Sequence, residues 1–339
     1  MTVSDAPQVV GGPWFEDFTI GETWRDPAGL TLGSGHAALH QAVVGDRLLL
    51  ALNAHLTKRV TTETQPLAHP NLVCDVAIGQ STRLTQRVIG NLFYRGLVLS
   101  RPVFLGETLE TITSVVGLKQ NRARPGAPAT GLVALRVDTW TAPGEHVLGF
   151  WRCPMIPLRD PDAQTGHADD FEDIPKSLDP VQVENAVPRT WDLSPLRNRA
   201  PEPHHAHLEP GQSFVLEAGE TVTGAPELAR LTLNLATAHT DATGSRRGQR
   251  LVYGGHTISV AAAHATRAIP AIATILAWES CDHLGPVFEG DVLRTELHVE
   301  DTTSLQRGGT ARLRALVSAV REGDQPEPVL DWRFVALVA

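Results

Sequence analysis

Residues 101–109 read Arg-Pro-Val-Phe-Leu-Gly-Glu-Thr-Leu, and residues 285–293 read Gly-Pro-Val-Phe-Glu-Gly-Asp-Val-Leu. A second matching pair follows at nearly the same distance along the chain, Val147-Leu-Gly-Phe-Trp-Arg152 and Val329-Leu-Asp-Trp-Arg333. Two matches in the same order and at similar spacing indicate a tandem duplication of a unit of roughly 150 residues, a common domain size. The repeat therefore predicts two copies of one fold in this chain.

A third match places the start of the repeated unit. Gly21-Glu-Thr, near the beginning of the chain, corresponds in our interpretation to Gly219-Glu-Thr. Between the two copies, the chain is acidic and rich in proline, which is typical of a linker that wraps the surface with little core of its own. We therefore divide the chain into an N-terminal domain (1–160), a linker (161–205) and a C-terminal domain (206–339).

Each copy shows a helical pattern followed by long strands. In the first copy, residues 34–56 are expected to be helical, with Ser34 as the N-cap. Helical spacing of apolar residues resumes at Pro70, which suits a first helical position, and continues to Val88. In the second copy, the Ala-rich run Thr257–Arg267 is the predicted helix. Strand patterns in the first copy cover residues 91–118, with breaks at Gly96 and Gly106, then 131–140 and 147–156. These patterns predict an α+β class, with one antiparallel sheet around one helix in each copy.

The composition excludes several classes of protein. The chain has 339 residues, of which 42% are hydrophobic and 20% charged, as in ordinary globular proteins. No apolar run approaches the ~20 residues of a membrane span, and the N-terminus lacks the layout of a signal peptide. The net charge is -9, with no basic cluster long enough to follow a nucleic-acid backbone. Three scattered cysteines without a Cys-x-x-Cys motif predict a reducing, cytoplasmic location, with neither disulfides nor a zinc site.

Residues suited to catalysis concentrate in the second copy. The stretch Thr232-Leu-Asn-Leu-Ala-Thr-Ala-His239-Thr-Asp241 places an amide, Asn234, five residues before an imidazole, His239. After a Gly/Arg-rich loop comes Leu251-Val-Tyr-Gly-Gly-His256, directly before the predicted helix. A histidine holds and releases a proton near neutral pH, and N–H groups at a helix start bind an anionic oxygen. The layout predicts a site in which the imidazole faces a bound carbonyl whose oxygen the helix-start amides hold.

The glycines before this helix are the expected oxyanion donors. Gly254 is the first candidate, and Gly255, one residue further on, is the alternative. Tyr253 and His256 flank them and are candidate substrate-binding residues, although His256 also suits a buried or capping role. Spacing alone equally permits a tight turn at the glycines and a polar helix face at the amide–imidazole pair.

These motifs, together with Trp14-Phe-Glu-Asp-Phe-Thr-Ile-Gly21 and Val116-Gly-Leu-Lys-Gln-Asn121, resemble the MaoC-like dehydratases. The resemblance covers nearly the whole chain outside the linker. It is nearest to the branch that converts mesaconyl-CoA and β-methylmalyl-CoA, through the Asn-x4-His pair and Arg250-Leu-Val-Tyr-Gly-Gly-His-Thr-Ile-Ser259. It implies a tandem, or double, hotdog fold, in which each half is a long helix wrapped by an antiparallel sheet.

The resembling group generally uses an Asp-x4-His pair, whereas this chain has Asn234 at the aspartate position, as the resemblance implies for the mesaconyl-CoA branch. Because an amide cannot take a proton, His239 is the titratable member of the pair. In the first half, Val44-Gly45-Asp46 stands where the motif begins, but Ala51 occupies the place of the histidine. We therefore expect the first half to have lost its catalytic pair.

The resemblance implies an enzyme, a carbon–oxygen lyase that reversibly hydrates an α,β-unsaturated acyl-CoA, with mesaconyl-CoA as the expected substrate. Hydration of another acyl-CoA, a hotdog thioesterase reaction, and non-catalytic acyl-CoA binding are the alternatives. No metal and no cofactor is expected, because CoA is part of the substrate. The expected partner is the acyl-CoA itself, with no nucleic acid and no membrane, and pairing of chains into a homo-oligomer is compatible with the sequence.

A dicarboxylic acyl group needs a cation for its free carboxylate. Arg246, Arg247 and Arg250, on the loop between the imidazole and the glycines, are candidates for this role. The alternative for each is a solvated loop charge, the commoner state of a surface arginine. Further basic residues that suit the CoA phosphates are Lys119, Arg122 and Arg124.

Overall fold

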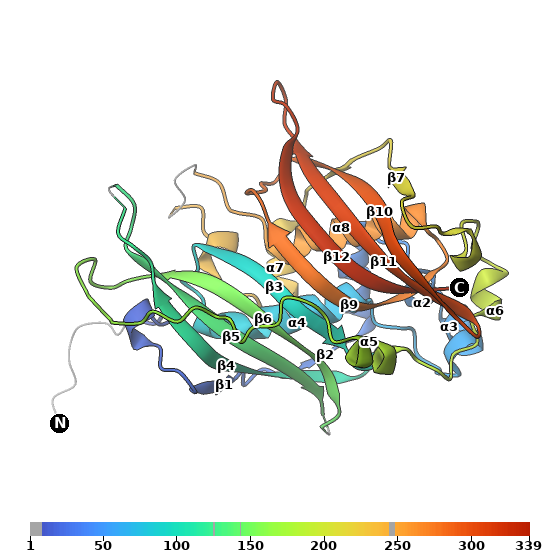
Figure 1. The fold of residues 1–339 in the computed structure, drawn as a ribbon, viewed down its shortest axis with the longest axis horizontal. Coiled ribbons are helices and arrows are strands. Elements are labelled where there is room, and N and C mark those ends of the chain that lie inside the picture. The colour runs from blue at the N-terminus through green and yellow to red at the C-terminus, as the bar shows by residue number, and fades with distance from the viewer. Residues whose placement is uncertain (1–8, 125, 143, 244–247) are drawn as a thin grey trace.

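The computed structural model describes residues 9–124, 126–142, 144–243 and 248–339. Their strands form one twelve-stranded antiparallel sheet, with the path β1-β4-β5-β6-β3-β9-β12-β11-β10-β7, β2 beside β4 and β8 beside β10 (Figure 1). The strands are β1 (Thr23–Arg25), β2 (Leu30–Thr31), β3 (Gly90–Leu99), β4 (Thr108–Gln120), β5 (Thr130–Thr141), β6 (His146–Pro157), β7 (Ser213–Val215), β8 (Glu220–Thr221), β9 (Ile272–His283), β10 (Val292–Leu305), β11 (Gly308–Val320) and β12 (Glu327–Val338).

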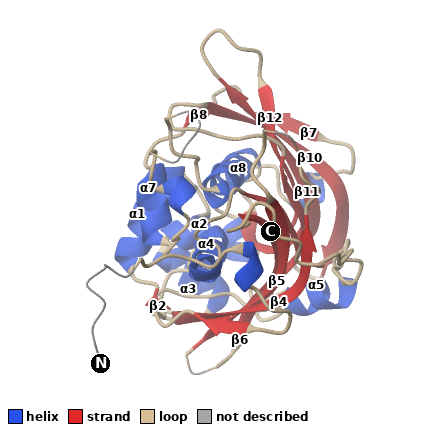
Figure 2. Ribbon diagram, turned by 90° about the vertical axis from the view of Figure 1, so that its left-hand side faces the viewer, coloured by secondary structure: helices blue, strands red, loops and turns tan. Residues whose placement is uncertain are grey.

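Two long helices, α4 and α8, lie against each other on one side of this curved sheet (Figure 2). The helices are α1 (Ser34–Val44), α2 (Leu49–Leu52), α3 (Ala54–Thr61), α4 (Pro70–Ser81), α5 (Pro180–Ala186), α6 (Ser194–Arg197), α7 (Ala225–Leu231) and α8 (Gly254–Ala268), with short 3-10 turns at Phe15–Asp17, Thr82–Leu84, His205–His207 and Thr237–His239. All residues of α4 and residues 255–266 of α8 are buried. Small and aliphatic side chains make up much of both helices, and buried polar residues such as Asp75 and Ser259 pair with each other.

The predicted duplication is confirmed by the order of the elements. In each half a central helix is followed by four long strands, β3 to β6 in the first and β9 to β12 in the second. The repeated stretches also occupy equivalent places. The Ser100 N–H donates to the Val147 carbonyl at 2.7 Å, and the Leu284 N–H donates to the Val329 carbonyl at 2.9 Å.

The third sequence match, of Gly21 with Gly219, pairs two residues that are not equivalent in the structure. Gly21, at φ +86°, donates its N–H to the Val115 carbonyl before β1. The residue that does the same in the second half is Gly211, at φ +92°, which donates to the Val299 carbonyl before β7. Gly219 instead precedes β8. The local similarity of Gly-Glu-Thr misled the alignment because glycine is favoured at both turns.

The halves join through β3 and β9, which pair antiparallel from Tyr94 opposite Cys281 to Val98 opposite Ala277. One continuous sheet therefore wraps both central helices, with α4 against β4 and β5 and α8 against β10, β11 and β12. A cavity at this junction can draw walls from both halves.

The linker runs across the outer face of the sheet, on the side away from the central helices (Figure 1). It is tied to β4 where Gln120 accepts from the Thr165 N–H at 2.8 Å, and α5 contacts both β3 and β9. The linker forms no separate core, but it contributes side chains to the main one. Trp191, Leu193 and Leu196 are buried and pack into the main hydrophobic cluster.

Four features of the helices differ from the predictions. The first helical region breaks into α1, α2 and α3, because Gly45 adopts a left-handed φ of +70° that ends α1. Ser34 is the first helical residue and Gly33 is the N-cap. The helix that begins at Pro70 ends at Ser81, so Val88 is not on it. The last central helix begins at Gly254, three residues before the predicted start.

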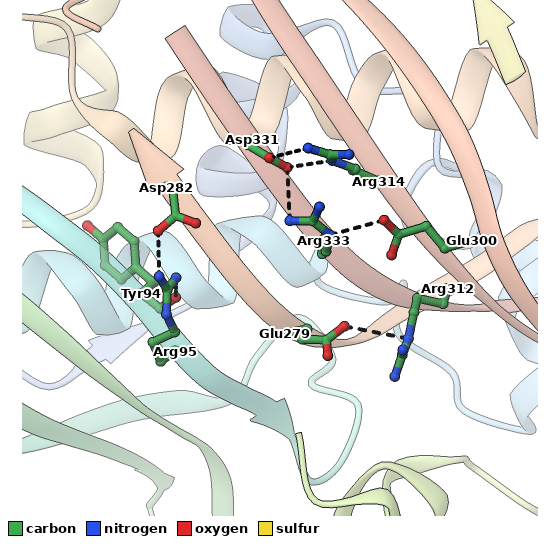
Figure 3. Close-up of polar contacts among 9 residues, drawn as sticks. All are labelled: Tyr94, Arg95, Glu279, Asp282, Glu300, Arg312, Arg314, Asp331 and Arg333. Atoms are coloured by element: carbon green, nitrogen blue, oxygen red, sulfur yellow. Dashed lines mark hydrogen bonds and ion pairs between the residues drawn. The ribbon is translucent and has the colours of Figure 1, made fainter. Parts of the chain in front are cut away.

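The strands alternate between buried and exposed residues, so one face packs on the helices and the other carries charges. Figure 3 shows this outer face, where Arg95 pairs with Asp282 at 2.7 Å and links the two halves. Arg314 and Arg333 both contact Asp331. Among the helices of the described residues, none is long and apolar enough to cross a membrane.

Candidate active site

A cavity of about 310 Å³ lies between the start of α8 and the inner face of β3 and β6. Its lining includes three residues predicted as catalytic, Asn234, His239 and Gly254. The other lining residues are Ile78, Thr82, Val88, Ile89, Gly90, Asn91, Tyr94, Arg152, Ala236, Ala238, Leu251, Val252, Tyr253, Thr257, His283, Leu284, Gly285, Pro286 and Val287. Both halves contribute, so the cavity belongs to the whole chain.

The first half's central helix positions the loop that carries Asn234. At Gly79 a Cβ atom would lie 1.7 Å from the Thr232 carbonyl oxygen, so glycine alone allows this close approach. The Leu235 N–H donates to the hydroxyl of Thr82 at 2.8 Å. Leu233 adopts a left-handed φ of +60°, a strained conformation for leucine that places the following side chain.

The Asn234 amide is oriented by one hydrogen bond. Its Oδ1 accepts the Ala236 N–H at 3.0 Å, and the side chain is 5% exposed. Since Oδ1 faces the backbone, the Nδ2 group is directed away from it, and it makes no hydrogen bond to a described residue. In this orientation Asn234 offers N–H donors to an oxygen atom in the cavity.

The tautomer of His239 follows from its contact with Leu251. The ring Nδ1 lies 2.9 Å from the Leu251 carbonyl oxygen. Because a carbonyl oxygen only accepts, Nδ1 carries the hydrogen, and Nε2 keeps its lone pair in the neutral ring. Burial, together with the positive charge of Arg152, lowers the pKa of His239 to about 4, against the opposing effect of the Leu251 carbonyl. At neutral pH the ring is therefore an unprotonated base.

The start of α8 presents free N–H groups at the cavity. Gly254 is the first helical residue, and no side chain caps the helix. Neither its N–H nor that of Gly255 donates to a described residue, whereas the His256 N–H turns back to the Tyr253 carbonyl. A Cβ atom at Gly254 would lie 2.5 Å from His283 Nε2. Orphan N–H groups at a helix start attract a negatively charged oxygen.

Three further predicted residues lie around this helix start. Tyr253 is buried and lines the cavity, and its ring centre is 5.6 Å from that of His239. Gly255 and His256 lie behind the cavity wall. A Cβ at Gly255 would lie 2.0 Å from Asp75 Oδ1, and His256 is fully buried with neither ring nitrogen hydrogen-bonded to a described residue. Gly255 can therefore reach the cavity through its backbone alone.

The arginines of the loop are placed in part. Arg246 and Arg247 lie outside the described residues. Arg250 pairs with Glu289 at 2.6 Å and does not line the cavity. The structure thus gives Arg250 a protein counter-ion of its own.

Sequence reasoning missed three residues of the cavity wall. Arg152, Tyr94 and His283 come from β6, β3 and β9 and are far from the motifs in sequence. Burial lowers the pKa of His283 to about 4, and its Nε2 has no hydrogen bond within the described chain. Strand alternation could have indicated which of these residues face inward, but no local signal distinguishes a cavity wall from a filled core.

A wider groove of about 1340 Å³ opens from the cavity and shares Val88, Ile89, Ala238 and Leu251 with it. Its apolar floor includes Leu92, which is 42% exposed. Lys119, Arg122 and Arg124 stand along it, and none of the three forms an ion pair with another described residue. Apolar surface leading to unpaired cations suits an elongated ligand with an anionic end.

In the described ranges, no group of three or more His, Cys, Asp or Glu side chains is arranged to hold a metal ion. His36 and His40, which are four residues apart, illustrate this. His40 is buried near His69, with the ring centres 5.2 Å apart. Burial lowers the pKa of His40, which marks it as a core residue.

No family model matches the chain. Mesaconyl-CoA hydratase of Cereibacter sphaeroides is 29% identical over 322 residues, which cover 93% of this chain and 91% of the relative. A conserved hypothetical protein of Mycobacterium tuberculosis with a double hotdog fold is 48% identical, with a TM-score of 0.87 over 96% of this chain and 98% of that chain. A putative MaoC domain protein dehydratase of Chloroflexus aurantiacus is 23% identical, with a TM-score of 0.83 over 98% and 99%, a likeness in fold.

One antiparallel sheet wrapped around two central helices, with a cavity at the helix start, defines a double hotdog protein, as expected. The chain belongs to the double hotdog family that includes the protein of Mycobacterium tuberculosis, and it is similar to the mesaconyl-CoA hydratase and to the putative MaoC domain protein dehydratase.

Proposed function

We propose that this protein hydrates the double bond of an α,β-unsaturated acyl-CoA, and catalyses the reverse dehydration, in the cavity lined by Asn234, His239 and Gly254. One observation carries the proposal. An imidazole with a free Nε2 lone pair and a helix start with free N–H groups meet in one cavity. These are the two groups that proton transfer beside a thioester carbonyl requires.

His239 is the acid and base of this reaction. In hydration, Nε2 takes a proton from water while the water oxygen bonds to Cβ of the acyl group, and the protonated ring then delivers that proton to Cα. In dehydration, Nε2 removes the Cα proton and passes it to the β-hydroxyl, which leaves as water. The hydrogen bond from Nδ1 to the Leu251 carbonyl holds the ring in the tautomer that both directions need.

Gly254 stabilises the charge that forms during the reaction. When the Cα–H bond breaks, or when oxygen adds at Cβ, the electron pair moves onto the thioester oxygen. The Gly254 N–H, at the positive end of α8, is free to donate to that oxygen. The Gly255 N–H stands one residue further along the same helix start.

Asn234 positions the water or the leaving hydroxyl. Its Oδ1 is occupied by the Ala236 N–H, so Nδ2 is the group available to an oxygen in the cavity. A neutral amide in this place donates without competing for the proton that His239 carries. This assigns proton transfer to His239 and orientation to Asn234.

The wider groove is the proposed path of the CoA moiety. Its apolar stretch suits the pantetheine arm, and the unpaired cations Lys119, Arg122 and Arg124 suit the phosphates. The expected acyl group is mesaconyl, giving β-methylmalyl-CoA as product, because the relative from Cereibacter sphaeroides is named mesaconyl-CoA hydratase.

The test follows the enoyl-thioester absorbance of mesaconyl-CoA and of crotonyl-CoA with the purified protein, together with an assay for free thiol. Loss of absorbance without thiol release is the expected result. Release of free thiol would assign thioester hydrolysis instead. Absence of turnover with both compounds would contradict the proposed hydration.

A further inference from the structure

Arg152 is a buried cation without a protein counter-ion. It lies on β6, lines the cavity and is 2% exposed. It forms no ion pair with any described residue. Burial of a charge away from water is costly unless an opposite charge or a full set of hydrogen bonds compensates it.

The hydrogen bonds of Arg152 are incomplete. One Nη group donates to the Ser81 hydroxyl at 2.7 Å, and the other lies 3.4 Å from the Thr85 hydroxyl. Ser81 gives its own hydrogen to the Ile78 carbonyl, so it acts as an acceptor for the guanidinium. The Nε–H has no partner in the described chain. A guanidinium has five N–H donors, so most of them are available to a ligand.

Tyr94 adds a second donor at the same place. It stands directly opposite Arg152 where β3 pairs with β6, so both side chains are neighbours on the inner face. Tyr94 is 3% exposed and lines the cavity, and its hydroxyl makes no hydrogen bond to a described residue. Burial raises the pKa of Tyr94 to about 12, which keeps the hydroxyl as a donor at neutral pH.

The equivalent position in the second half holds an apolar residue. Val147 and Val329 are equivalent, and the pairing of β6 with β5 and of β12 with β11 stays in step over the following residues, so Arg152 corresponds to Phe334. Phe334 is fully buried and stacks on Trp332, with ring centres 3.9 Å apart. An apolar residue therefore fits this fold position, and packing alone does not require arginine.

We infer that Arg152, with Tyr94 beside it, binds a carboxylate at the far end of the acyl group, and that the cavity selects short acyl-CoA substrates that carry such a second acid. The inference rests on the proposed function and assigns its substrate class. A planar carboxylate can accept two parallel hydrogen bonds from the guanidinium fork. A cavity of about 310 Å³ holds a short acyl chain and the water.

Other cations near the site are less suited to this role. Arg250 is neutralised by Glu289. Lys119, Arg122 and Arg124 line the outer groove and not the inner cavity, where the acyl group must lie to meet His239. Arg152 lines the inner cavity together with His239.

The test compares two pairs of compounds that differ in the distal carboxylate. Mesaconyl-CoA and crotonyl-CoA report turnover, and the saturated succinyl-CoA and butyryl-CoA report binding by calorimetry without reaction. The variants are Arg152→Gln, Arg152→Lys and Tyr94→Phe. Arg95→Gln is the matched control, since Arg95 adjoins Tyr94 on β3 but lies on the outer face in an ion pair with Asp282 (Figure 3).

We expect Arg152→Gln to lower kcat/KM for mesaconyl-CoA on the order of 100-fold, the usual scale for removing one partner of a buried charge pair. The loss with crotonyl-CoA should be at least about 10-fold smaller. Succinyl-CoA affinity should fall by a similar factor to that of mesaconyl-CoA, with butyryl-CoA affinity much less affected. Arg152→Lys should lie between Arg152→Gln and the parent protein, because it keeps the charge and loses the fork.

Equal losses for both members of each pair would overturn the inference and leave the proposed hydration intact. The same holds if the parent protein hydrates crotonyl-CoA and ignores mesaconyl-CoA. If neither compound is hydrated, the proposed function fails, and equal binding of succinyl-CoA and butyryl-CoA then overturns the assignment of Arg152 as well. Circular dichroism of each variant confirms folding, and the lysine variant serves if the glutamine variant does not fold.

Discussion

The starts of α4 and α8 occupy equivalent places in the two halves but differ in the groups that chemistry requires. α8 begins with Gly254, whose N–H is free, whereas α4 begins with Pro70, which has no N–H. In α4 the next N–H, of Asn71, is capped by His69 Nδ1 at 3.1 Å. The cavity beside α8 has a volume of about 310 Å³, and the one beside α4 about 10 Å³.

The first half also has polar residues at its helix start, but these contact each other. Asp46 accepts the N–H two residues further on, as Asn234 does in the second half. The other oxygen of Asp46 lies 3.0 Å from His69 Nε2, and Ala186 of the linker helps to close the remaining space. This arrangement supports the prediction that the first half has lost its catalytic pair.

The two halves contribute different parts of the cavity. The second half supplies the loop and helix start with the proposed catalytic groups, and the first half supplies the opposite wall with Tyr94 and Arg152. Gly79 of α4 also lets the loop that carries Asn234 pack closely. Loss of one site therefore does not make the first half dispensable.

The largest expected effect comes from replacing His239 of the second half, compared with a replacement at Asp46 in the first half. His239→Gln should lower kcat for hydration on the order of 1000-fold, because it removes the general base. Asp46→Asn, at the position that corresponds to Asn234, should leave the rate within about 2-fold, because Asp46 serves structure alone. Initial rates of enoyl-thioester loss measure both. A comparable loss in Asp46→Asn would mean that the first half takes part in the chemistry.

The second prediction concerns the helix start. Gly254→Ala should lower kcat on the order of 100-fold, because the new Cβ meets His283 Nε2 and displaces the oxyanion donor. Shortening the obstacle in the double variant Gly254→Ala/His283→Ala should recover part of that loss. Pro70→Ala at the start of α4 is the matched control and should keep the parent rate. Full activity in Gly254→Ala would remove this N–H from the mechanism.

The third prediction concerns the tenth residue of each central helix, Gly79 in α4 and Ala263 in α8. Gly79→Ala should destabilise the protein by about 2 kcal/mol or more, because the Cβ would overlap the Thr232 carbonyl. It should also lower activity by moving Asn234. The equivalent exchange in α8, Ala263→Gly, should cost about 1 kcal/mol through helix propensity and spare the rate. Urea unfolding with parallel assays separates the cases, and equal effects of both exchanges would contradict the close-approach argument.

The fourth prediction concerns Asp75, at the crossing of α4 and α8, where Ser259 donates to it at 3.2 Å. Burial raises the pKa of Asp75 to about 7. Since the folded form holds this proton more tightly than the unfolded chain, stability falls as pH rises from about 4 to about 7. Asp75→Asn cannot ionise, so its advantage over the parent should grow by about 2 kcal/mol between pH 5 and pH 8. A constant difference across this range in urea unfolding would contradict the buried carboxyl.

The smallest expected effect lies in the pH profile. Because burial lowers the pKa of His239 to about 4, the ring stays a base down to that pH. The value of kcat/KM should therefore decline only as pH falls through about 4, and it should be flat between pH 6 and pH 7. A midpoint near the ordinary histidine value of about 6.5 would show that the free site is well solvated.

The fold was largely predictable because the repeat carries its own evidence. The Pro-Val-Phe stretches fall at equivalent turns, and the central helices and the long strands of the first half lie close to where periodicity placed them. Boundaries were less predictable. Gly45 ends a helix although the apolar spacing continues past it. Gly-Glu-Thr occurs before β1 in the first copy and before β8 in the second, which are not equivalent strands.

The site was predictable where its residues lie close together in sequence. Asn234, His239 and Gly254 share one motif region and one cavity. Arg152 and Tyr94 were not predictable, because they meet through the pairing of β6 with β3. A buried arginine in a strand has no sequence signature. The loop arginines were predicted to bind the substrate's free carboxylate because they lie near His239 in sequence.

The start of α8 borders a cavity of about 310 Å³ and the start of α4 one of about 10 Å³, so we expect one acyl-CoA site per chain. Calorimetric titration of the protein with butyryl-CoA, a saturated thioester that cannot react, tests it most directly. The structure predicts one binding site per chain, and binding that weakens when bulk is placed in the open cavity by Gly254→Leu. Two equivalent sites per chain, or binding unaffected by that substitution, would contradict the account.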